Sequence, residues 1–168
     1  MSADIVLESV VLRPYTLQMA HEVLSSAPRP DWAEDFPTDG DSVVCALLLR
    51  ADEAEAGYTP PTVVAPWTGP WQMRARIADG SIAIGGIGFK GGPRDGAVEV
   101  GYGMAASAHG RGHMTAAVTA LVELARAQQV RVIAETEPGN VASERVLLRC
   151  GFVITHTADD GNTWWATA

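Results

Sequence analysis

Apolar residues in the first third of the chain change from the spacing of a strand to the spacing of a helix. Residues 6–13 alternate loosely and stop at Pro14, which predicts a first strand. Residues 17–24 carry apolar side chains at helical spacing, which predicts a helix that ends before Pro28. A second helical stripe predicts a helix over residues 41–54, capped by the Asp-Ser pair at its start.

The rest of the chain alternates between the two spacings. Asp79-Gly80 is typical of a two-residue hairpin turn, and Gly85-Gly86 interrupts an alternating stretch, which predicts a bulge. The predicted elements are strands over 71–78, 81–89 and 97–104, a helix over 112–129, a strand over 130–135, a helix from Asn140 to Gly151, and a hairpin of 152–157 and 163–167.

Strands in series, followed by a strand–helix–strand crossover, predict one α/β domain over residues 1–168. The crossover requires the strands at 97–104 and 130–135 to be parallel, whereas the earlier strands pair antiparallel. We expect a mixed, mostly antiparallel sheet of six to seven strands flanked by about four helices.

Composition narrows the class of protein. The 168 residues are 47% hydrophobic and 19% charged, which is typical of a globular domain, and no apolar run is long enough to span a membrane. Isolated Cys45 and Cys150 and an N-terminus without signal-peptide character favour the cytoplasm. The net charge of −8, with Lys90 as the one lysine, argues against direct binding of nucleic acid.

A Gly-Arg-Gly turn at Gly110–Gly112 lies between the strand at 97–104 and the helix at 112–129. This order directs free backbone N–H groups and the positive end of the helix dipole at one point, which attracts phosphate. No Gly-Lys-Ser/Thr follows, and Gly101 and Gly103 lie inside the strand, so neither a P-loop nor a dinucleotide fingerprint fits. The alternative is a tight connection whose glycines only permit the turn.

Two segments in combination resemble the GNAT superfamily of acetyl-CoA-dependent N-acetyltransferases. Residues 109–115 resemble its pyrophosphate loop, and Asn140-x-x-Ser143 with Gly151-Phe152 resembles its second signature. The resemblance covers most of residues 71–155, and Glu-Val-Gly-Tyr at 99–102 most resembles the branch that acetylates N-termini of ribosomal proteins. His109 and Met114 depart from the family's usual Gln/Arg and Gly/Ala.

The resemblance implies a GNAT-like fold, acetyl-CoA as co-substrate and no metal, with the pantetheine arm between the two parallel strands. Met114 also fits the apolar stripe of its helix, and Asn140 also fits a helix cap, so both have structural alternatives. The residues expected to bind the cofactor are Val100, Tyr102, His109, Gly110, Arg111, Gly112, His113, Met114, Thr115 and Asn140.

Acetyl transfer to an amine needs a base for the amine and an acid for the leaving thiolate. We expect Glu99 to be the base, with Glu135 in reserve, and Ser143 to be the acid. Other branches use a tyrosine at the position of Leu147, so a tyrosine acid here would have to be Tyr102. The structural alternatives are a solvated carboxylate at Glu99 and a serine in the first turn of a helix at Ser143.

The acceptor stays open. A protein N-terminus or a small amine such as an aminoglycoside or polyamine fits, and Trp32, Trp67 and Trp71 are candidates for an acceptor pocket. The acidic surface favours a cationic substrate. The alternatives are a sensor that binds acetyl-CoA without turnover and a nucleotide-binding module. We expect no membrane partner, and the oligomeric state is open, with a homodimer as one alternative.

Overall fold

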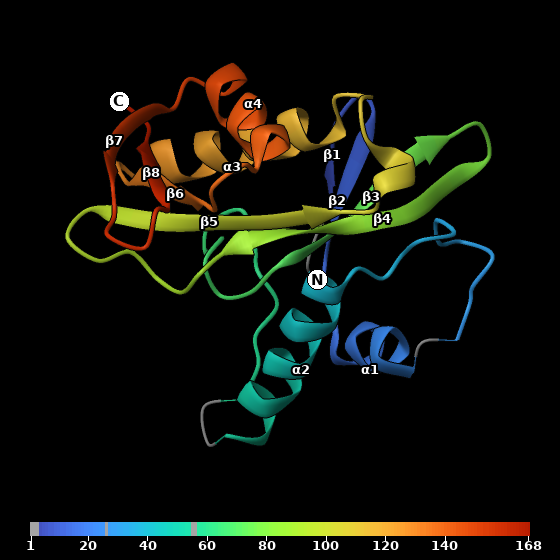
Figure 1. Cartoon of the computed structure of the whole chain (residues 1–168). Coiled ribbons are helices and arrows are strands. Elements are labelled where there is room, and N and C mark those ends of the chain that lie inside the picture. The colour runs from blue at the N-terminus through green and yellow to red at the C-terminus, as the bar shows by residue number, and fades with distance from the viewer. Residues whose placement is uncertain (1–3, 26, 55–56) are drawn as a thin grey trace.

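A computed structural model describes residues 4–25, 27–54 and 57–168 (Figure 1). An eight-stranded sheet in the order β1-β2-β3-β4-β5-β6-β8-β7 runs through the described part. The strands are β1 Ile5–Val6, β2 Val10–Pro14, β3 Trp71–Ile77, β4 Gly80–Phe89, β5 Ala97–Met104, β6 Arg131–Thr136, β7 Val153–Thr157 and β8 Thr163–Ala166. The helices are α1 Leu17–Ser25, α2 Asp39–Glu53, α3 His113–Arg126 and α4 Val141–Arg149, with a 3₁₀ turn at Ala106–Ala108.

Helices cover both faces of the sheet: α3 and α4 lie on one side and α1 and α2 on the other (Figure 1). Neighbouring strands are antiparallel except β5 and β6, which the crossover through α3 makes parallel. None of the described helices is long and apolar enough to cross a membrane.

The parallel pairing of β5 with β6 is short. It joins Ala97, Val98 and Glu99 to residues 131–133, although β5 continues to Met104 and β6 to Thr136. Beyond Glu99, the two strands have no register partners on each other in the described structure. The sheet therefore opens at this point, and the backbone edge of β5 is left without a neighbouring strand.

Side chains of β5 alternate between the two faces. Val98 and Val100 are buried in the cluster that includes Ala117 and Leu121 of α3. Glu99, Gly101 and Gly103 therefore face the α2 side, where Cβ atoms built on the two glycines would meet the side chains of Lys90 and Thr38. The strand thus presents tyrosine and valine to one helix layer, and a carboxylate and bare backbone to the other.

Three sequence-based boundaries need correction. Residues 6–13 form not one strand but the hairpin β1–β2, closed by a hydrogen bond from the Leu7 N–H to the Val10 carbonyl, so the strand count exceeds six to seven. Helix α2 begins earlier than predicted, because Thr38 is its cap and Asp41 completes a capping box. The bulge lies at Ile84, beside the predicted glycine pair.

The α1–α2 loop is tied to the sheet and to the segment before α3. Ala83 of β4 exchanges backbone hydrogen bonds with Asp31 and Ala33. Further along the loop, the Asp35 carboxylate accepts hydrogen bonds from the backbone N–H and the hydroxyl of Ser107 in the 3₁₀ turn. These hydrogen bonds lower the pKa of Asp35. The loop is thereby fixed beside the end of β5.

Candidate active site

The chain from β5 to α3 forms a cradle of backbone donors. Gly110 and Gly112 adopt φ angles of 75° and 78°, a region that side chains disfavour, and Gly112 is the N-cap of α3. The N–H groups that open a helix have no acceptor within it. Among the described residues, no hydrogen bond outside the helix uses the N–H groups of residues 110–115. These N–H groups are therefore available to a ligand at the start of α3.

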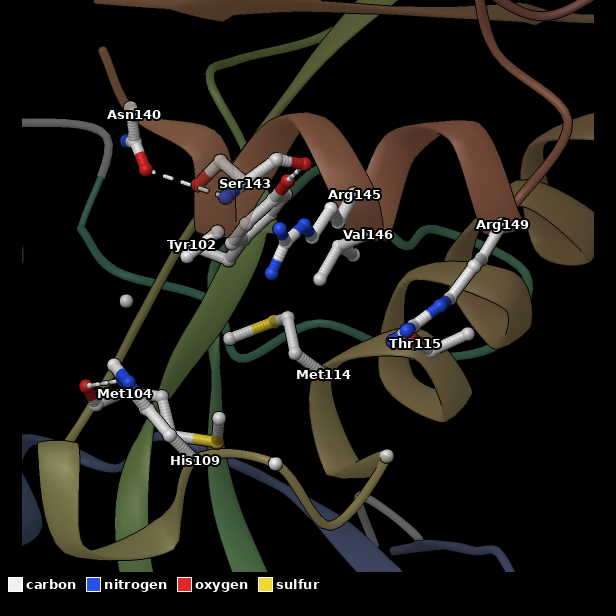
Figure 2. A pocket seen from close by; sticks show the side chains of 14 residues that line it. Tyr102, Met104, His109, Met114, Thr115, Asn140, Ser143, Arg145, Val146 and Arg149 are labelled. Atoms are coloured by element: carbon white, nitrogen blue, oxygen red, sulfur yellow. Dashed lines mark hydrogen bonds between the residues drawn. The ribbon is translucent and has the colours of Figure 1, made fainter.

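A pocket of about 410 Å³ lies over this cradle, between the end of β5 and α4 (Figure 2). Its lining comes from the last three residues of β5, the glycine loop, the first turn of α3 and one face of α4. The lining residues are Tyr102, Gly103, Met104, His109, Gly110, Gly112, Met114, Thr115, Asn140, Ala142, Ser143, Arg145, Val146 and Arg149.

The charge of the pocket is opposite to that of the chain. Arg145 and Arg149 line it, and none of its lining residues is an aspartate or glutamate, although the chain carries a net charge of −8. Within the described residues neither guanidinium has a hydrogen-bond or ion-pair partner. A cationic lining over free N–H donors is suited to an anionic ligand.

Asn140 caps α4 as its position predicts. Its side-chain oxygen accepts a hydrogen bond of 3.2 Å from the Ser143 N–H, which leaves the Asn140 amide NH₂ available as a donor. Because Asn140 supplies the cap, the Ser143 hydroxyl is not needed for that purpose. In the described structure this hydroxyl has no partner, and Figure 2 shows Ser143 at the pocket beside Tyr102.

Tyr102 reaches across from β5 to α4. Its hydroxyl donates to the backbone carbonyl of Ser143 at 3.4 Å. Burial raises the pKa of Tyr102 to about 12. The phenol is therefore a neutral proton donor throughout the physiological pH range, and two hydroxyl-bearing residues meet at one end of the pocket.

The remaining candidates for cofactor binding take different positions. The His109 Nε2 lies 3.1 Å from the Met104 carbonyl oxygen, within hydrogen-bond distance. His109 therefore supports the loop as well as lining the pocket. Val100 has its side chain in the core, and only its backbone borders the opening beside β6. Met114 is buried in the core cluster and also lines the pocket, so both expected roles apply.

Arg111 and His113 do not line the pocket with their side chains. Arg111 is exposed on the loop. His113 is buried, with its Nδ1 3.2 Å from the Ser9 hydroxyl in the β1–β2 turn. Burial, with Arg111 nearby, lowers the pKa of His113. What these two residues can offer a ligand in the pocket is their backbone N–H groups.

Glu99 lies on the sheet face opposite the pocket. Its Oε1 is bonded to the ammonium of Lys90, which lies across Gly101, while Oε2 has no partner among the described residues. The Glu99 side chain retains 20% of its exposure. A strand rises about 3.3 Å per residue, so the α-carbons of Glu99 and Tyr102 are about 10 Å apart. The structure does not bring Glu99 into contact with Ser143.

Glu135 lies on the same face, two residues beyond the partner of Glu99 on β6. Its Oε1 accepts a hydrogen bond of 2.8 Å from Asn162. Trp164, its register partner on β8, is stacked on His156 with ring centroids 6.1 Å apart. Carboxylates and an aromatic pair therefore lie where the sheet opens.

The three tryptophans expected at an acceptor pocket, Trp32, Trp67 and Trp71, lie in different environments. Trp71 is 1% exposed and belongs to the core. Trp32 packs edge-on against Phe36 at 5.1 Å, and Trp67 packs partly buried against the core.

Sequence reasoning missed six lining residues. Two of them, Arg145 and Arg149, follow Asn140 at a spacing that puts them on one face of α4 together with Ala142 and Val146. This helical spacing is visible in the sequence itself. Gly103 and Met104 depend on where β5 parts from β6, which no local pattern in the sequence marks.

Comparison with known proteins agrees with this architecture. The model of the acetyltransferase (GNAT) domain matches residues 5–153. The uncharacterized N-acetyltransferase YjdG of Bacillus subtilis is 29% identical over 84 residues, which are 48% of this chain and 50% of the relative. The match thus spans half of that relative's length.

Solved structures show the same fold at low identity. A ribosomal-protein-S5-alanine acetyltransferase from Vibrio fischeri has a TM-score of 0.61 and 18% identity, covering 99% of this chain and 96% of the other. The microcin C7 self-immunity acetyltransferase MccE, solved with acetyl-CoA and AMP, has a TM-score of 0.64 and 16% identity, covering 96% and 93%. With the family model matching most of its length, the chain belongs to the GNAT family of acetyltransferases, which use acetyl-CoA.

Proposed function

We propose that this domain transfers an acetyl group from acetyl-CoA directly to a primary amine, with the pocket between β5 and α4 holding the coenzyme. The observation that carries the proposal is the combination of free N–H donors at the start of α3 with a pocket that lacks carboxylates and opens beside β5. The expected cofactor residues other than Val100, Arg111 and His113 line that pocket.

The residues present fit coenzyme A. The left-handed glycines Gly110 and Gly112 keep side chains away from the N–H row, where a pyrophosphate would bind. The unpaired backbone edge of β5 from Val100 to Tyr102 offers donors and acceptors to the amides of a pantetheine arm. The free NH₂ of Asn140 supplies one more donor. Acetyl-CoA supplies the thioester that reacts.

Ser143 is the proposed acid. Its hydroxyl lines the pocket without a partner in the described structure, so it is free to donate a proton to the sulfur as the thiolate leaves. Tyr102 is the competing donor, because its neutral phenol lies beside Ser143. The Tyr102 hydroxyl already donates to a carbonyl, and this favours Ser143.

Glu99 is the proposed base. Because Glu99 lies about 10 Å along β5 from Tyr102, the amine proton reaches it through water rather than directly. Its free Oε2 can accept that proton while Lys90 holds Oε1. Glu135 is the second candidate. It lies two residues beyond Ile133, the β6 partner of Glu99, and is therefore nearer to the opening of the sheet.

The acceptor amine is proposed to approach from the α1–α2 side of the sheet, because the coenzyme pocket occupies the α3–α4 side. The carboxylates Glu99 and Glu135 and the Trp164 ring favour a cationic group at that face. A protein N-terminus and a small polyamine or aminoglycoside both meet this requirement.

The test is release of free thiol from acetyl-CoA with a panel of N-terminal peptides, polyamines and aminoglycosides. Turnover with any amine, abolished by leaving that amine out, supports the proposal. The ion pair of Glu99 with Lys90 gives a specific reason to consider a second function, a sensor that binds acetyl-CoA without turnover. Tight binding of acetyl-CoA with no thiol release from any amine would favour the sensor.

A further inference from the structure

Two arginines of α4 extend into the coenzyme pocket from the side opposite the glycine loop. Figure 2 shows Arg149 reaching toward Thr115 in the first turn of α3, and Arg145 pointing into the space between Tyr102 and Met114. They are four residues apart on one helix, so their β-carbons are about 5–6 Å apart. In Figure 2 the two guanidinium groups point to different parts of the pocket, so a single anion contacts both when one of these exposed side chains turns toward the other.

The surroundings leave both guanidinium groups available. Each arginine is exposed, and within the described residues neither forms a hydrogen bond or ion pair. The chain has 20 acidic residues, yet none of them lines this pocket. Two unpaired cations beside one another repel, and an anionic ligand between them removes that repulsion.

Coenzyme A carries two kinds of phosphate. Each phosphate of the pyrophosphate has about one negative charge, and the 3′-phosphate of the ribose is a monoester with a charge of about −1.5 to −2 at neutral pH. The row of N–H groups at residues 110–115 is suited to the pyrophosphate. Arg149 lies beside Thr115, the last residue of that row, so an anion bound by its guanidinium group would lie next to a pyrophosphate that fills the row.

We infer that Arg145 and Arg149 form a subsite for the 3′-phosphate of coenzyme A, so that the protein distinguishes coenzyme A from 3′-dephospho-coenzyme A. This inference rests on the proposed function, since it assumes that the pocket holds coenzyme A. Arginine suits the role because its planar group donates two parallel hydrogen bonds to phosphate oxygens.

The test is calorimetric binding of coenzyme A and of 3′-dephospho-coenzyme A, which needs no acceptor. We expect the wild-type chain to bind coenzyme A at least about hundredfold more tightly, since each arginine is expected to contribute about tenfold or more. Arg149→Gln and Arg145→Gln should each weaken binding of coenzyme A by about tenfold to hundredfold, the range for charge-assisted hydrogen bonds. Their affinity for 3′-dephospho-coenzyme A should change less than about twofold, and the double variant should bind both ligands equally.

Arg50→Gln is the matched control. Arg50 is exposed, lies in the last turn of α2 as Arg149 does in α4, and is on the other side of the sheet. The control loses the same charge and the same helix-end interaction, so it should retain the preference for coenzyme A.

Three results would overturn the inference. Wild-type protein that binds both ligands equally has no 3′-phosphate subsite. Arginine variants that weaken both ligands equally place the arginines at the pyrophosphate or in the fold. A wild-type chain that binds neither ligand overturns the proposed function itself, and this result is distinct from the other two.

Discussion

The Tyr102 hydroxyl donates a hydrogen bond to the backbone carbonyl of Ser143, and this contact joins β5 to α4 at one end of the pocket. It brings two potential proton donors together, and only Ser143 has a side-chain hydroxyl without a partner in the described structure. Removal of the Ser143 hydroxyl and removal of the Tyr102 hydroxyl are therefore expected to have different effects on turnover.

Ser143→Ala should lower kcat by about tenfold to hundredfold, at the weak end of acid catalysis because a thiolate leaves readily. The melting temperature should hardly change, because Asn140 and not Ser143 supplies the cap of α4. Tyr102→Phe, measured in parallel, should retain kcat within about threefold. A drop in melting temperature with unchanged kcat for Ser143→Ala would make the serine structural, and the reverse ranking of the two variants would make Tyr102 the acid.

Gly112→Val should weaken binding of coenzyme A severely, because a branched side chain would stand beside the free N–H groups that open α3. The φ of 78° also strains any residue other than glycine, at a cost of about 1–3 kcal/mol. Gly91→Val separates the two effects, since Gly91 has a φ of 87° in the β4–β5 loop, away from the pocket. Calorimetry should show lost affinity for Gly112→Val alone, and equal affinity in both variants would refute the phosphate assignment.

Glu99→Gln should lower turnover by about 10²–10⁴-fold with near-normal affinity for acetyl-CoA, as removal of a general base does. The deficit should shrink at high pH, where more of the amine is already deprotonated. Glu135→Gln is the parallel variant on the same face of the sheet. Thiol-release rates from pH 6 to 10 would identify the base, and a Glu99→Gln enzyme within twofold of wild type at neutral pH would transfer the role to Glu135.

Asp41 gives a prediction about stability. Burial raises the pKa of its carboxyl against the lowering effect of its hydrogen bonds from Thr38. A raised pKa means that the folded state favours the protonated form, so the stability gained is present below the unfolded value of about 3.9 and is lost as pH rises through the folded pKa. Urea unfolding should therefore show wild type losing stability relative to Asp41→Asn between pH 4 and 7. A difference that is constant with pH would contradict this.

Local patterns predicted most of the elements because each carries its own signal. The Asn140 cap of α4 and the apolar stripe of α3 need only neighbouring residues to act, and the structure confirms both. The hairpin of β3 and β4 is also confirmed, but its two-residue turn is Ala78-Asp79 and not Asp79-Gly80, because Gly80 is already in β4 and pairs with Ile77. The hairpin β1–β2 was missed because its turn at Leu7–Val10 contains neither glycine nor proline.

Contacts between particular side chains were not predicted from the sequence. Lys90 and Glu99 face each other across the β4–β5 hairpin, but no pattern in the loop between the strands marks the register that brings them together. Likewise, the burial of His113 against Ser9 depends on two segments more than a hundred residues apart. The face on which a strand residue lies follows from alternation, but the partner it meets there follows from the whole topology.

The pocket has one further property: every residue of its lining lies between Tyr102 and Arg149. A single uninterrupted stretch of chain thus contains the whole lining, whereas the opposite face draws on segments as distant as Thr38 and Trp164. Substitutions in the α1–α2 region can therefore alter the opposite face of the sheet without changing any residue of the lining.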